Sequence, residues 1–344
     1  MTSTGGMEND ILRRADPQVP TASIKAAAVR GRAPWTMLRN MVLLAQGATQ
    51  ARQLLADFFP EAVLVTGGYV SVPVGIAARQ KRVPLAVFLP DVVPGLAVRF
   101  LARLAGRVAT TTPDSARYLP RGKAVATGYP VRPALLSLDR EQARIRLGLS
   151  PTEAVLLVYG GSRGARSINR AIGAGLAEFL GQATLLHICG QEGDDVELRR
   201  QAARLPEQLR AKYHLHPYLH DEMPAALAAA DLAVCRAGAS TLGELPAAGL
   251  PAILVPYPYV HQEENADYLV RSGAAVKVLD AQLRTRDGTP NPTALLAAVR
   301  QVLEDPVRRA QMAAAAQRIA RPKAAAAIAE VLRSLAHHPA GSEV

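Results

Sequence analysis

Short apolar runs alternate with longer amphipathic segments along most of the chain. Several of the runs are apolar throughout, which is typical of strands that are buried on both faces of a parallel sheet. The segments between them have helical spacing, so the order predicts βαβ units and an α/β fold. The predicted strands are residues 61–66, 84–89, 107–112, 123–127, 154–159, 183–188, 213–218, 231–235, 251–255 and 275–279.

A break in this pattern indicates a boundary between two domains. Residues 128–137 contain Pro130 and Pro133, and a new strand is predicted from Ala154. The length of 344 residues fits two domains. We therefore predict two doubly wound, Rossmann-like domains, over residues 1–133 and 134–322, with a cleft between them. A C-terminal helix and tail, residues 323–344, has apolar positions with which it can pack back on the first domain.

The start of the chain departs from this scheme. Residues 1–20 are polar and show no strand pattern. A doubly wound domain normally begins with a strand and a glycine turn. We therefore expect the N-terminal domain to be incomplete, without its first βα unit.

Composition and charge narrow the class of partner. Apolar residues make up 49% of the chain and charged residues 20%, which excludes wholesale disorder. The net charge of +11 predicts an anionic partner, such as nucleic acid, an anionic membrane or a phosphorylated substrate. Aromatic residues are only 4%, and no nucleic-acid-binding module accompanies the charge, so we predict no nucleic-acid partner. Cys189 and Cys235 lie in separate apolar runs, which predicts buried free thiols in a reducing compartment.

Two basic amphipathic segments point to a membrane surface. No signal-peptide pattern follows Met1, and no apolar stretch reaches the ~18 residues of a spanning helix, so we expect a cytoplasmic protein. Residues 30–44 and 94–107 nevertheless combine arginines with apolar side chains at helical spacing, as in helices that lie on anionic bilayers. Such helices also simply cover a core, and both interpretations stay open. The residues concerned include Arg30, Arg32, Trp35, Arg39, Arg99, Phe100 and Arg103.

Residues 235–244 (CRAGASTLGE) carry the strongest signal for a ligand. A predicted strand ends at Cys235, and a loop of small residues leads into a predicted helix. Small residues let a phosphate approach the backbone, and the first N–H groups of a helix favour its charge. Glu244, one turn further, can accept both hydroxyls of a ribose. An ordinary helix cap explains Ser240 and Thr241 equally well.

Further glycine-rich turns also follow predicted strands. In residues 159–166 (YGGSRGAR), glycine permits a close approach and Ser162 can donate to a phosphate oxygen. Residues 66–75 (TGGYVSVPVG) form either a tight turn or a ligand loop in the first domain. In residues 261–266 (HQEENA), the amides suit sugar hydroxyls. The chain shows no metal-ligand spacing, so we predict neither a metal nor another cofactor.

Taken in order, these segments resemble the MurG family of bacterial glycosyltransferases, which have the two-domain GT-B fold. The resemblance begins at residues 5–8 (GGME), is most specific over residues 230–256, and reaches residues 318–325 (RIARPKAA). It implies an inverting hexosyltransferase that moves N-acetylglucosamine (GlcNAc) from UDP-GlcNAc to undecaprenyl-pyrophosphoryl-MurNAc-pentapeptide, which forms lipid II for peptidoglycan. It also implies a peripheral place on the cytoplasmic face of the cell membrane, with anionic inner-leaflet lipid as a partner.

The resemblance also implies roles for individual residues. Glu244 would bind the uridine ribose, the helix start at Ser240 would contact the diphosphate, and Gln262 would contact the sugar. The implied donor-site residues are Arg132, Gly161, Ser162, Leu219, Ala239, Ser240, Thr241, Glu244, Gln262 and Asn265. Gly67, Gly68 and Tyr69 would face the lipid-linked acceptor, and Trp35, Arg39, Arg99, Phe100 and Arg103 would face the membrane.

Three departures from the family pattern fall in or beside the acceptor half. The opening GGTGGH loop, whose histidine is a candidate base, has no counterpart here. Residues 88–91 (FLPD) replace the family's HEQN, which leaves Asp91 as the nominated base, and Tyr129 replaces an asparagine. Two alternatives follow: a related lipid-directed UDP-sugar transferase with another acceptor, or a non-catalytic nucleotide-sugar-binding subunit. The second would need a protein partner to supply the missing strand and loop.

Overall fold

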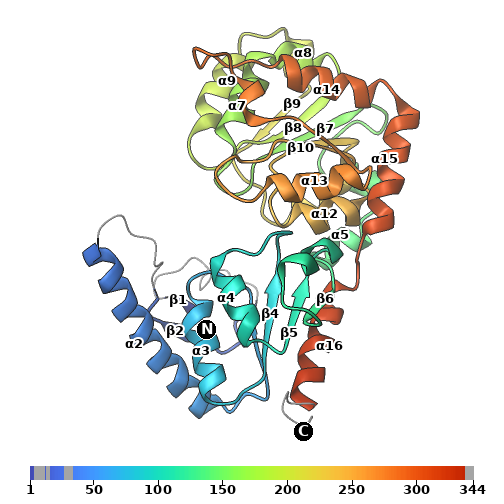
Figure 1. Cartoon of the computed structure of the whole chain (residues 1–344). Coiled ribbons are helices and arrows are strands. Elements are labelled where there is room, and N and C mark those ends of the chain that lie inside the picture. Colours follow the sequence, from blue (N-terminus) through green and yellow to red (C-terminus); the bar gives the residue numbers. More distant parts are fainter. Residues whose placement is uncertain (4–11, 13–15, 27–33, 338–344) are drawn as a thin grey trace. The chain divides into compact units, whose positions relative to one another are not determined.

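The computed structural model describes residues 1–3, 12, 16–26 and 34–337, which form two compact units (Figure 1). Unit 1 comprises residues 1–127 and 325–344, and unit 2 comprises residues 128–324. Residues 5–8, where the family resemblance begins, and Arg30 and Arg32 of the first basic segment lie outside the described residues.

Unit 1 contains a four-stranded parallel sheet with the order β3-β4-β5-β6. Its strands are β3 (Val63–Val65), β4 (Leu85–Leu89), β5 (Arg107–Thr110) and β6 (Ala124–Ala126). They confirm the four strands that the apolar runs predict in this part of the chain. The connecting elements are α3 (Ser71–Gln80), α4 (Leu96–Leu104) and the 3-10 helix η1 (Pro113–Tyr118), and α2 (Pro34–Phe58) packs on α3.

The core of unit 1 lies mainly between the sheet and helices α2, α3 and α4. Leu85, Val87 and Leu89 of β4 pack there with Leu101 of α4. Alternate residues of a strand point to opposite faces, and Ala86 accordingly packs on the other side, against α16 (Ala324–His337). Helix α16 therefore covers the second face of the unit 1 sheet, although it follows unit 2 in the sequence.

The first residues of the chain form a strand that the sequence pattern misses. β1 (Thr2–Ser3) pairs in parallel with β2 (Ser23–Ile24) in a separate two-stranded sheet, so the prediction that residues 1–20 contain no strand is wrong. Thr2 donates its N–H to the carbonyl of Ala22 at 2.9 Å. The strand depends on this backbone pairing and has no apolar run of its own, which is why hydrophobic patterning does not detect it.

Unit 2 contains a six-stranded parallel sheet with the order β12-β11-β10-β7-β8-β9. From β7 the chain first moves outward through β8 and β9, then returns to place β10 beside β7, and continues through β11 and β12. The connections after β7 and β10 therefore leave the sheet at its switch point, where open α/β sheets bind ligands. The strands are β7 (Val155–Tyr159), β8 (Thr184–Ile188), β9 (Tyr213–His216), β10 (Leu232–Cys235), β11 (Ala252–Leu254) and β12 (Ala275–Lys277), each within a predicted run.

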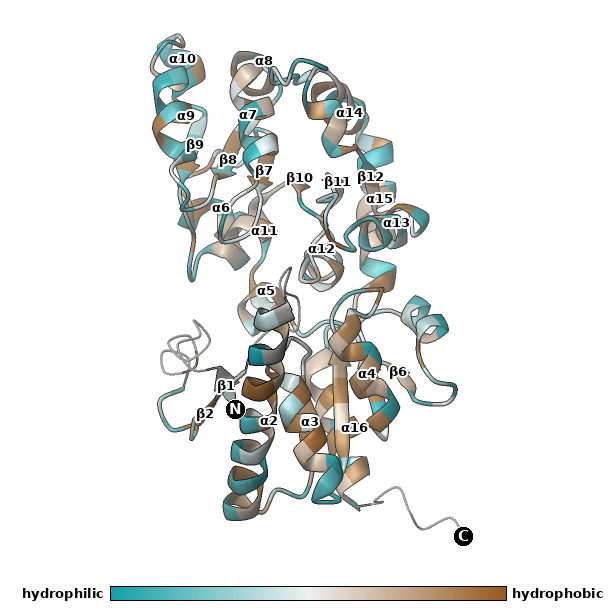
Figure 2. Ribbon diagram, turned by 60° about the vertical axis from the view of Figure 1, so that its left-hand side comes forward, coloured by the Kyte–Doolittle hydropathy of each residue, from teal (hydrophilic) through white to brown (hydrophobic). Residues whose placement is uncertain are grey.

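The helices of unit 2 cover this sheet and combine hydrophilic and hydrophobic residues (Figure 2). Leu156, Val158 and Val234 of the central strands share a core with Ile168, Ile172 and other residues of the covering helices. The helices are α5 (Pro133–Ser137), α6 (Arg140–Arg146), α7 (Arg166–Ala174), α8 (Leu176–Leu180), α9 (Asp194–Ala202), α10 (Glu207–Arg210), α11 (Met223–Ala229), α12 (Thr241–Ala248), α13 (Glu263–Arg271), η2 (Asp280–Leu283), α14 (Thr293–Leu303) and α15 (Pro306–Ile319).

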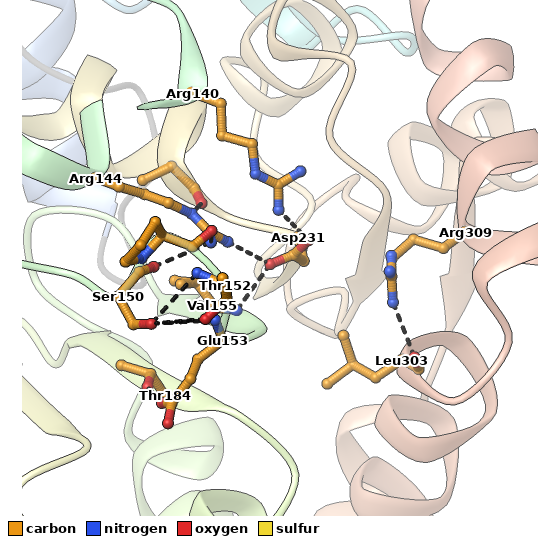
Figure 3. A network of polar contacts seen from close by, with 12 residues as sticks. Arg140, Arg144, Ser150, Thr152, Glu153, Val155, Thr184, Asp231, Leu303 and Arg309 are labelled. Atoms are coloured by element: carbon orange, nitrogen blue, oxygen red, sulfur yellow. Dashed lines mark hydrogen bonds and ion pairs between the residues drawn. The ribbon is translucent and has the colours of Figure 1, made fainter. Parts of the chain in front are cut away.

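A buried ionic network anchors α6 to the amino ends of β7 and β10 (Figure 3). Asp231, just before β10, accepts from Arg140, from Arg144 at 2.7 Å and from the N–H of Val155 at 2.8 Å. The side chain of Arg144 is only 5% exposed, and its other nitrogens donate to backbone carbonyls. Each charge in the network is therefore paired, as burial requires.

We predict that Asp231→Ala lowers the free energy of unfolding by about 3–5 kcal/mol, because it leaves the Arg144 guanidinium buried without its counter-charge. Urea unfolding followed by circular dichroism measures this loss. Glu207→Ala is the matched control, since Glu207 pairs with Arg210 at the exposed surface and its loss is expected to cost less than about 1 kcal/mol. Equal losses in the two variants would contradict the assignment of Asp231 as an anchor.

Candidate functional site

A cleft of about 720 Å³ lies in unit 2 at the carboxyl ends of the central strands. The connections after β7, β10 and β11 contribute to its walls, together with η2. Its charged lining is mostly basic, because five arginines face two carboxylates, and this favours an anionic ligand. The charged lining residues are Arg163, Arg166, Arg170, Arg236, Arg284, Glu192 and Asp280.

The loop after β7 has a backbone conformation that requires glycine at two positions. Gly161 and Gly164 have φ angles of 86° and 81°, in the left-handed region, and the N–H of Gly164 donates to the carbonyl of Gly161 at 2.9 Å. A Cβ on Gly164 would lie 2.0 Å from the carbonyl oxygen of Cys189, at the end of β8. The loop therefore packs directly on the neighbouring strand, and Ser162 at its tip is exposed.

A side-chain hydroxyl within the loop after β10 stabilises the turn of that loop. Thr241, the first residue of α12, is buried and donates to the carbonyl of Gly238 at 2.6 Å. Ser240 occupies the N-cap position but makes no side-chain capping bond, so the ordinary cap that the sequence also allowed is not formed. Ala239, Ser240 and the first amides of α12 are thus placed beside the cleft, which Ser240 and Thr241 line.

Glu244 lies one turn into α12 and is half-buried. Burial raises the pKa of its carboxyl above the ordinary value, while the Ser240 hydroxyl and the Arg132 guanidinium favour the ionised form and act in the opposite direction. Arg132 in turn donates to the carbonyl of His220 at 2.8 Å. The structure therefore brings Arg132, Ser240, Glu244 and the segment that contains buried Leu219 into one corner of unit 2.

Arg236 is a cleft residue that the sequence analysis did not select. Its guanidinium donates to Asp280 at 2.7 Å and to the hydroxyl of Ser167 at 2.8 Å, and that hydroxyl donates to Asp280 at 2.6 Å. Its position directly after β10 is a signal that could have identified it, because basic residues at strand ends can meet an anionic ligand. Ser167 and Asp280 gave no such signal, since they lie far from Arg236 in the sequence.

The two predicted amides of the α13 segment differ in their surroundings. Gln262 lines the cleft, and its Oε1 accepts from the N–H of Tyr257 at 2.9 Å, which fixes the preceding turn. Asn265 is fully buried and donates to the carbonyl of Ala237 at 3.0 Å, so it supports the loop after β10 from beneath. Tyr257 and Tyr259, in edge-to-face contact at 5.2 Å, form an exposed rim that sequence reasoning missed.

The predicted acceptor-side residues follow strands of unit 1. Gly67 and Gly68, after β3, have φ angles of 91° and 77°, and Tyr69 beside them is exposed. The hydroxyl of Ser71 donates to the carbonyl of Gly67 and closes this turn. Asp91 follows β4 and is half-buried.

The basic amphipathic segments carry exposed apolar side chains. On α2, Trp35 is 81% exposed and Arg39 is exposed. On α4, Phe100 is 39% exposed beside the exposed Arg99 and Arg103. No helix among the described residues is both long and apolar enough to cross a bilayer. Across the same residues, no group of three or more His, Cys, Asp or Glu side chains is arranged to hold a metal ion.

Family models match both parts of the chain and define its class. Residues 1–110 match the glycosyltransferase family 28 N-terminal domain, and residues 155–330 match the C-terminal domain of the same family. The UDP-N-acetylglucosamine–N-acetylmuramyl-(pentapeptide) pyrophosphoryl-undecaprenol N-acetylglucosamine transferase of Roseiflexus sp. is 49% identical over 365 residues, which cover 97% of this chain and 82% of that protein. The protein of the same name from Moorella thermoacetica is 40% identical over 336 residues, covering 95% of this chain and 87% of that protein.

Comparison with solved structures gives a result consistent with these relatives. The crystal structure of Acinetobacter baumannii MurG is similar with a TM-score of 0.72 and 26% identity, covering 96% of this chain and 89% of that one. A UDP-GlcNAc 2-epimerase from Neisseria meningitidis, solved with UDP-GlcNAc, has a TM-score of 0.65 at 15% identity, covering 86% and 82% of the two chains, and shares the fold. The chain belongs to glycosyltransferase family 28 and, within it, to the MurG family of N-acetylglucosamine transferases.

We predict that Gly164→Ala lowers the free energy of unfolding by about 1–3 kcal/mol more than Gly288→Ala does. Both residues have positive φ angles and lie in unit 2, so both variants share the strain of an L-residue in that conformation. Only Gly164 is packed against backbone, because a Cβ on Gly288 meets nothing within 4 Å. Paired urea titrations measure the difference, and equal losses would contradict the tight packing of the loop on β8.

Proposed function

We propose that this protein transfers GlcNAc from UDP-GlcNAc to undecaprenyl-pyrophosphoryl-MurNAc-pentapeptide, converting lipid I to lipid II for peptidoglycan. The single observation that carries the proposal is the corner at the start of α12, where a helix N-terminus and a glycine loop line one basic cleft and a half-buried carboxylate follows one helical turn further on. The names of the curated relatives support the same substrates. Growth, shape and division of the cell would then depend on this step.

In the donor complex, each part of the corner meets one part of UDP-GlcNAc. The Glu244 carboxylate accepts from the two ribose hydroxyls, and the amides at Ser240 and Thr241 bind the diphosphate at the positive end of the α12 dipole. Gly161 and Ser162 approach the diphosphate from the β7 loop. The uracil lies against the backbone at Leu219, and Gln262 meets the sugar hydroxyls.

The reaction is an inverting displacement at C1 of the sugar. A base takes the proton from the acceptor hydroxyl, the hydroxyl oxygen attacks C1, and UDP departs with the electron pair of the broken C–O bond. The amides of α12 and the β7 loop, together with the guanidinium of Arg236, stabilise the charge that grows on the leaving diphosphate. Asp91 is the residue that we nominate as the base, and Gly67, Gly68 and Tyr69 are the loop that we assign to the acceptor.

The acceptor is a membrane lipid, so we place the protein at the cytoplasmic face of the cell membrane. Helices α2 and α4 supply the contact, with Trp35 and Phe100 entering the interface and Arg39, Arg99 and Arg103 meeting anionic headgroups. Their exposure in unit 1 supports this role, because isolated large apolar side chains beside arginines suit an interface of mixed polarity.

We predict that Glu244→Gln weakens UDP binding by about 1.5–3 kcal/mol, because a neutral amide is a poorer acceptor for the ribose hydroxyls than a carboxylate. Isothermal titration calorimetry measures the change. Glu197→Gln changes an exposed carboxylate on α9 of the same unit. It is the matched control and is expected to bind UDP normally. An unchanged affinity in Glu244→Gln would remove the α12 corner from the nucleotide site.

We predict that the protein binds anionic vesicles and that added salt weakens this binding. Arg103→Glu is expected to lower the affinity at least about fivefold, since each cation near the surface contributes about 1 kcal/mol. Arg146→Glu, an exposed arginine of unit 2, is the control with the same charge change. Co-sedimentation with phosphatidylglycerol vesicles measures both, and equal effects would assign the binding to net charge alone.

A second candidate is a related transferase with another lipid-linked acceptor. Residues 88–91 (FLPD) and Tyr129, where the family has different polar residues, favour it. Radiolabelled UDP-GlcNAc with a lipid I analogue separates the two, because only the first candidate forms labelled lipid II. Donor binding without transfer to any acceptor would instead favour a nucleotide-sugar-binding subunit that works with a protein partner.

A further inference from the structure

The hydroxyl of Tyr159 is a buried polar group at the base of the candidate donor site. Tyr159 is the last residue of β7, and the ladder pairs it with Cys235, the last residue of β10. The preceding Val158 and Val234 enter the core that includes α7 and α14, so Tyr159 and Cys235 point to the opposite face of the sheet. Tyr159 also lines the cleft, although it is only 7% exposed.

No nitrogen or oxygen atom of the described residues forms a hydrogen bond with the oxygen of Tyr159, which has only the thiol of Cys235 as a weak partner. Buried hydroxyl groups in folded proteins nearly always have a partner, because burial without one loses the bonds to water. A phenylalanine would supply the same ring at the end of this apolar strand without that cost. The hydroxyl therefore has a use that packing of the strand does not explain.

The polar groups that act on Tyr159 are the thiol of Cys235 and the carboxyl of Glu244. Burial, with these two groups, raises the pKa of the phenol well above its ordinary value, so the group stays a neutral O–H donor. The Cys235 thiol is a weak acceptor, whereas a carboxylate is a strong one. The carboxylate of Glu244 is thus the strong acceptor in this corner to which the phenol O–H can donate.

The Ser240 hydroxyl links this pair to the ligand. It now favours the ionised form of Glu244, and it also lies at the N-terminus of α12, where the diphosphate binds in the proposed donor complex. A diphosphate at that position competes with Glu244 for the hydroxyl. The carboxylate then needs another donor just when its two oxygens must face the ribose.

We propose that Tyr159 is a positioning residue for Glu244: when the nucleotide sugar draws the Ser240 hydroxyl to its diphosphate, the Tyr159 hydroxyl donates to the Glu244 carboxylate and orients it toward the ribose. This inference rests on the proposed function. It assigns a role in donor binding to a residue that the sequence analysis treated only as the end of a strand.

The test is Tyr159→Phe, with binding of UDP-GlcNAc measured by calorimetry across a range of pH. UDP-GlcNAc is the probe because both of its phosphates are esterified, whereas the terminal phosphate of UDP titrates near pH 6, as phosphate monoesters do. In the parent protein, affinity falls as the pH is lowered through the raised pKa of Glu244, because the protonated carboxyl accepts poorly. In Tyr159→Phe we expect affinity at neutral pH to fall roughly fivefold to twentyfold. We also expect the fall in affinity at low pH, the acid limb of the pH profile, to move to higher pH. The reason is that the ionised form of Glu244 has lost a hydrogen-bond donor.

Tyr213→Phe is the matched control, since it removes the phenol of a half-buried tyrosine in the same sheet. The hydroxyl of Tyr213 bonds to Nδ1 of His187 at 2.9 Å, and Tyr213 does not line the cleft. It is expected to leave the affinity and the acid limb unchanged. Thermal unfolding checks that Tyr159→Phe is folded, and we expect its stability to be equal or higher, because the buried hydroxyl that is removed has only a weak thiol partner.

A combined Tyr159→Phe and Glu244→Gln variant separates the possible failures. We expect no further loss of affinity beyond Glu244→Gln alone, because the phenol acts through the carboxylate. If Glu244→Gln weakens binding but Tyr159→Phe keeps the parental affinity and acid limb, only this inference is overturned. A uniform loss at every pH with an unmoved limb overturns it in favour of packing. If Glu244→Gln itself binds normally, the proposed donor site fails first.

Discussion

The adjacency of β7 and β10 is the constraint on which the candidate site depends. Because β10 returns to pair with β7, two connections from different parts of the sequence leave the sheet side by side. The connection after β7 supplies a glycine-rich loop, and the connection after β10 supplies the start of α12. Neither makes a nucleotide site alone, and the register of the two strands sets the distance between them.

The backbone around this switch point is held from several directions. The carbonyl of Cys189, on which Gly164 packs, also accepts from the amide of Asn169 at 2.7 Å, and Asn169 in turn meets His187. Asn265 similarly holds the carbonyl of Ala237 in the other loop. Both loops therefore rest on buried amides, which fits a site that binds its ligand largely through preorganised main-chain groups.

The sequence was sufficient for the strands and for the loops, because both depend on local patterns. Each apolar run became a strand, and the glycine turns lie at strand ends. The pattern failed at Thr2–Ser3, where backbone pairing with Ser23–Ile24 replaces hydrophobicity. It also failed for Arg236, whose setting depends on Ser167 and Asp280 from distant elements. Gln262 and Asn265 gave the same signal in the sequence, yet Gln262 lines the cleft and Asn265 is buried. Sequence alone does not distinguish the buried face of a helix N-terminus from its exposed face.

The place of α16 affects how the protein is made on the ribosome. Unit 1 is built from both ends of the chain, and unit 2 is inserted between them. During synthesis, every residue of unit 2 therefore emerges before α16 does, so unit 2 has all of its strands while the Ala86 face of the unit 1 sheet is still uncovered. Unit 1 therefore completes its structure only after unit 2 has been translated, and until then its uncovered apolar face is open to premature association.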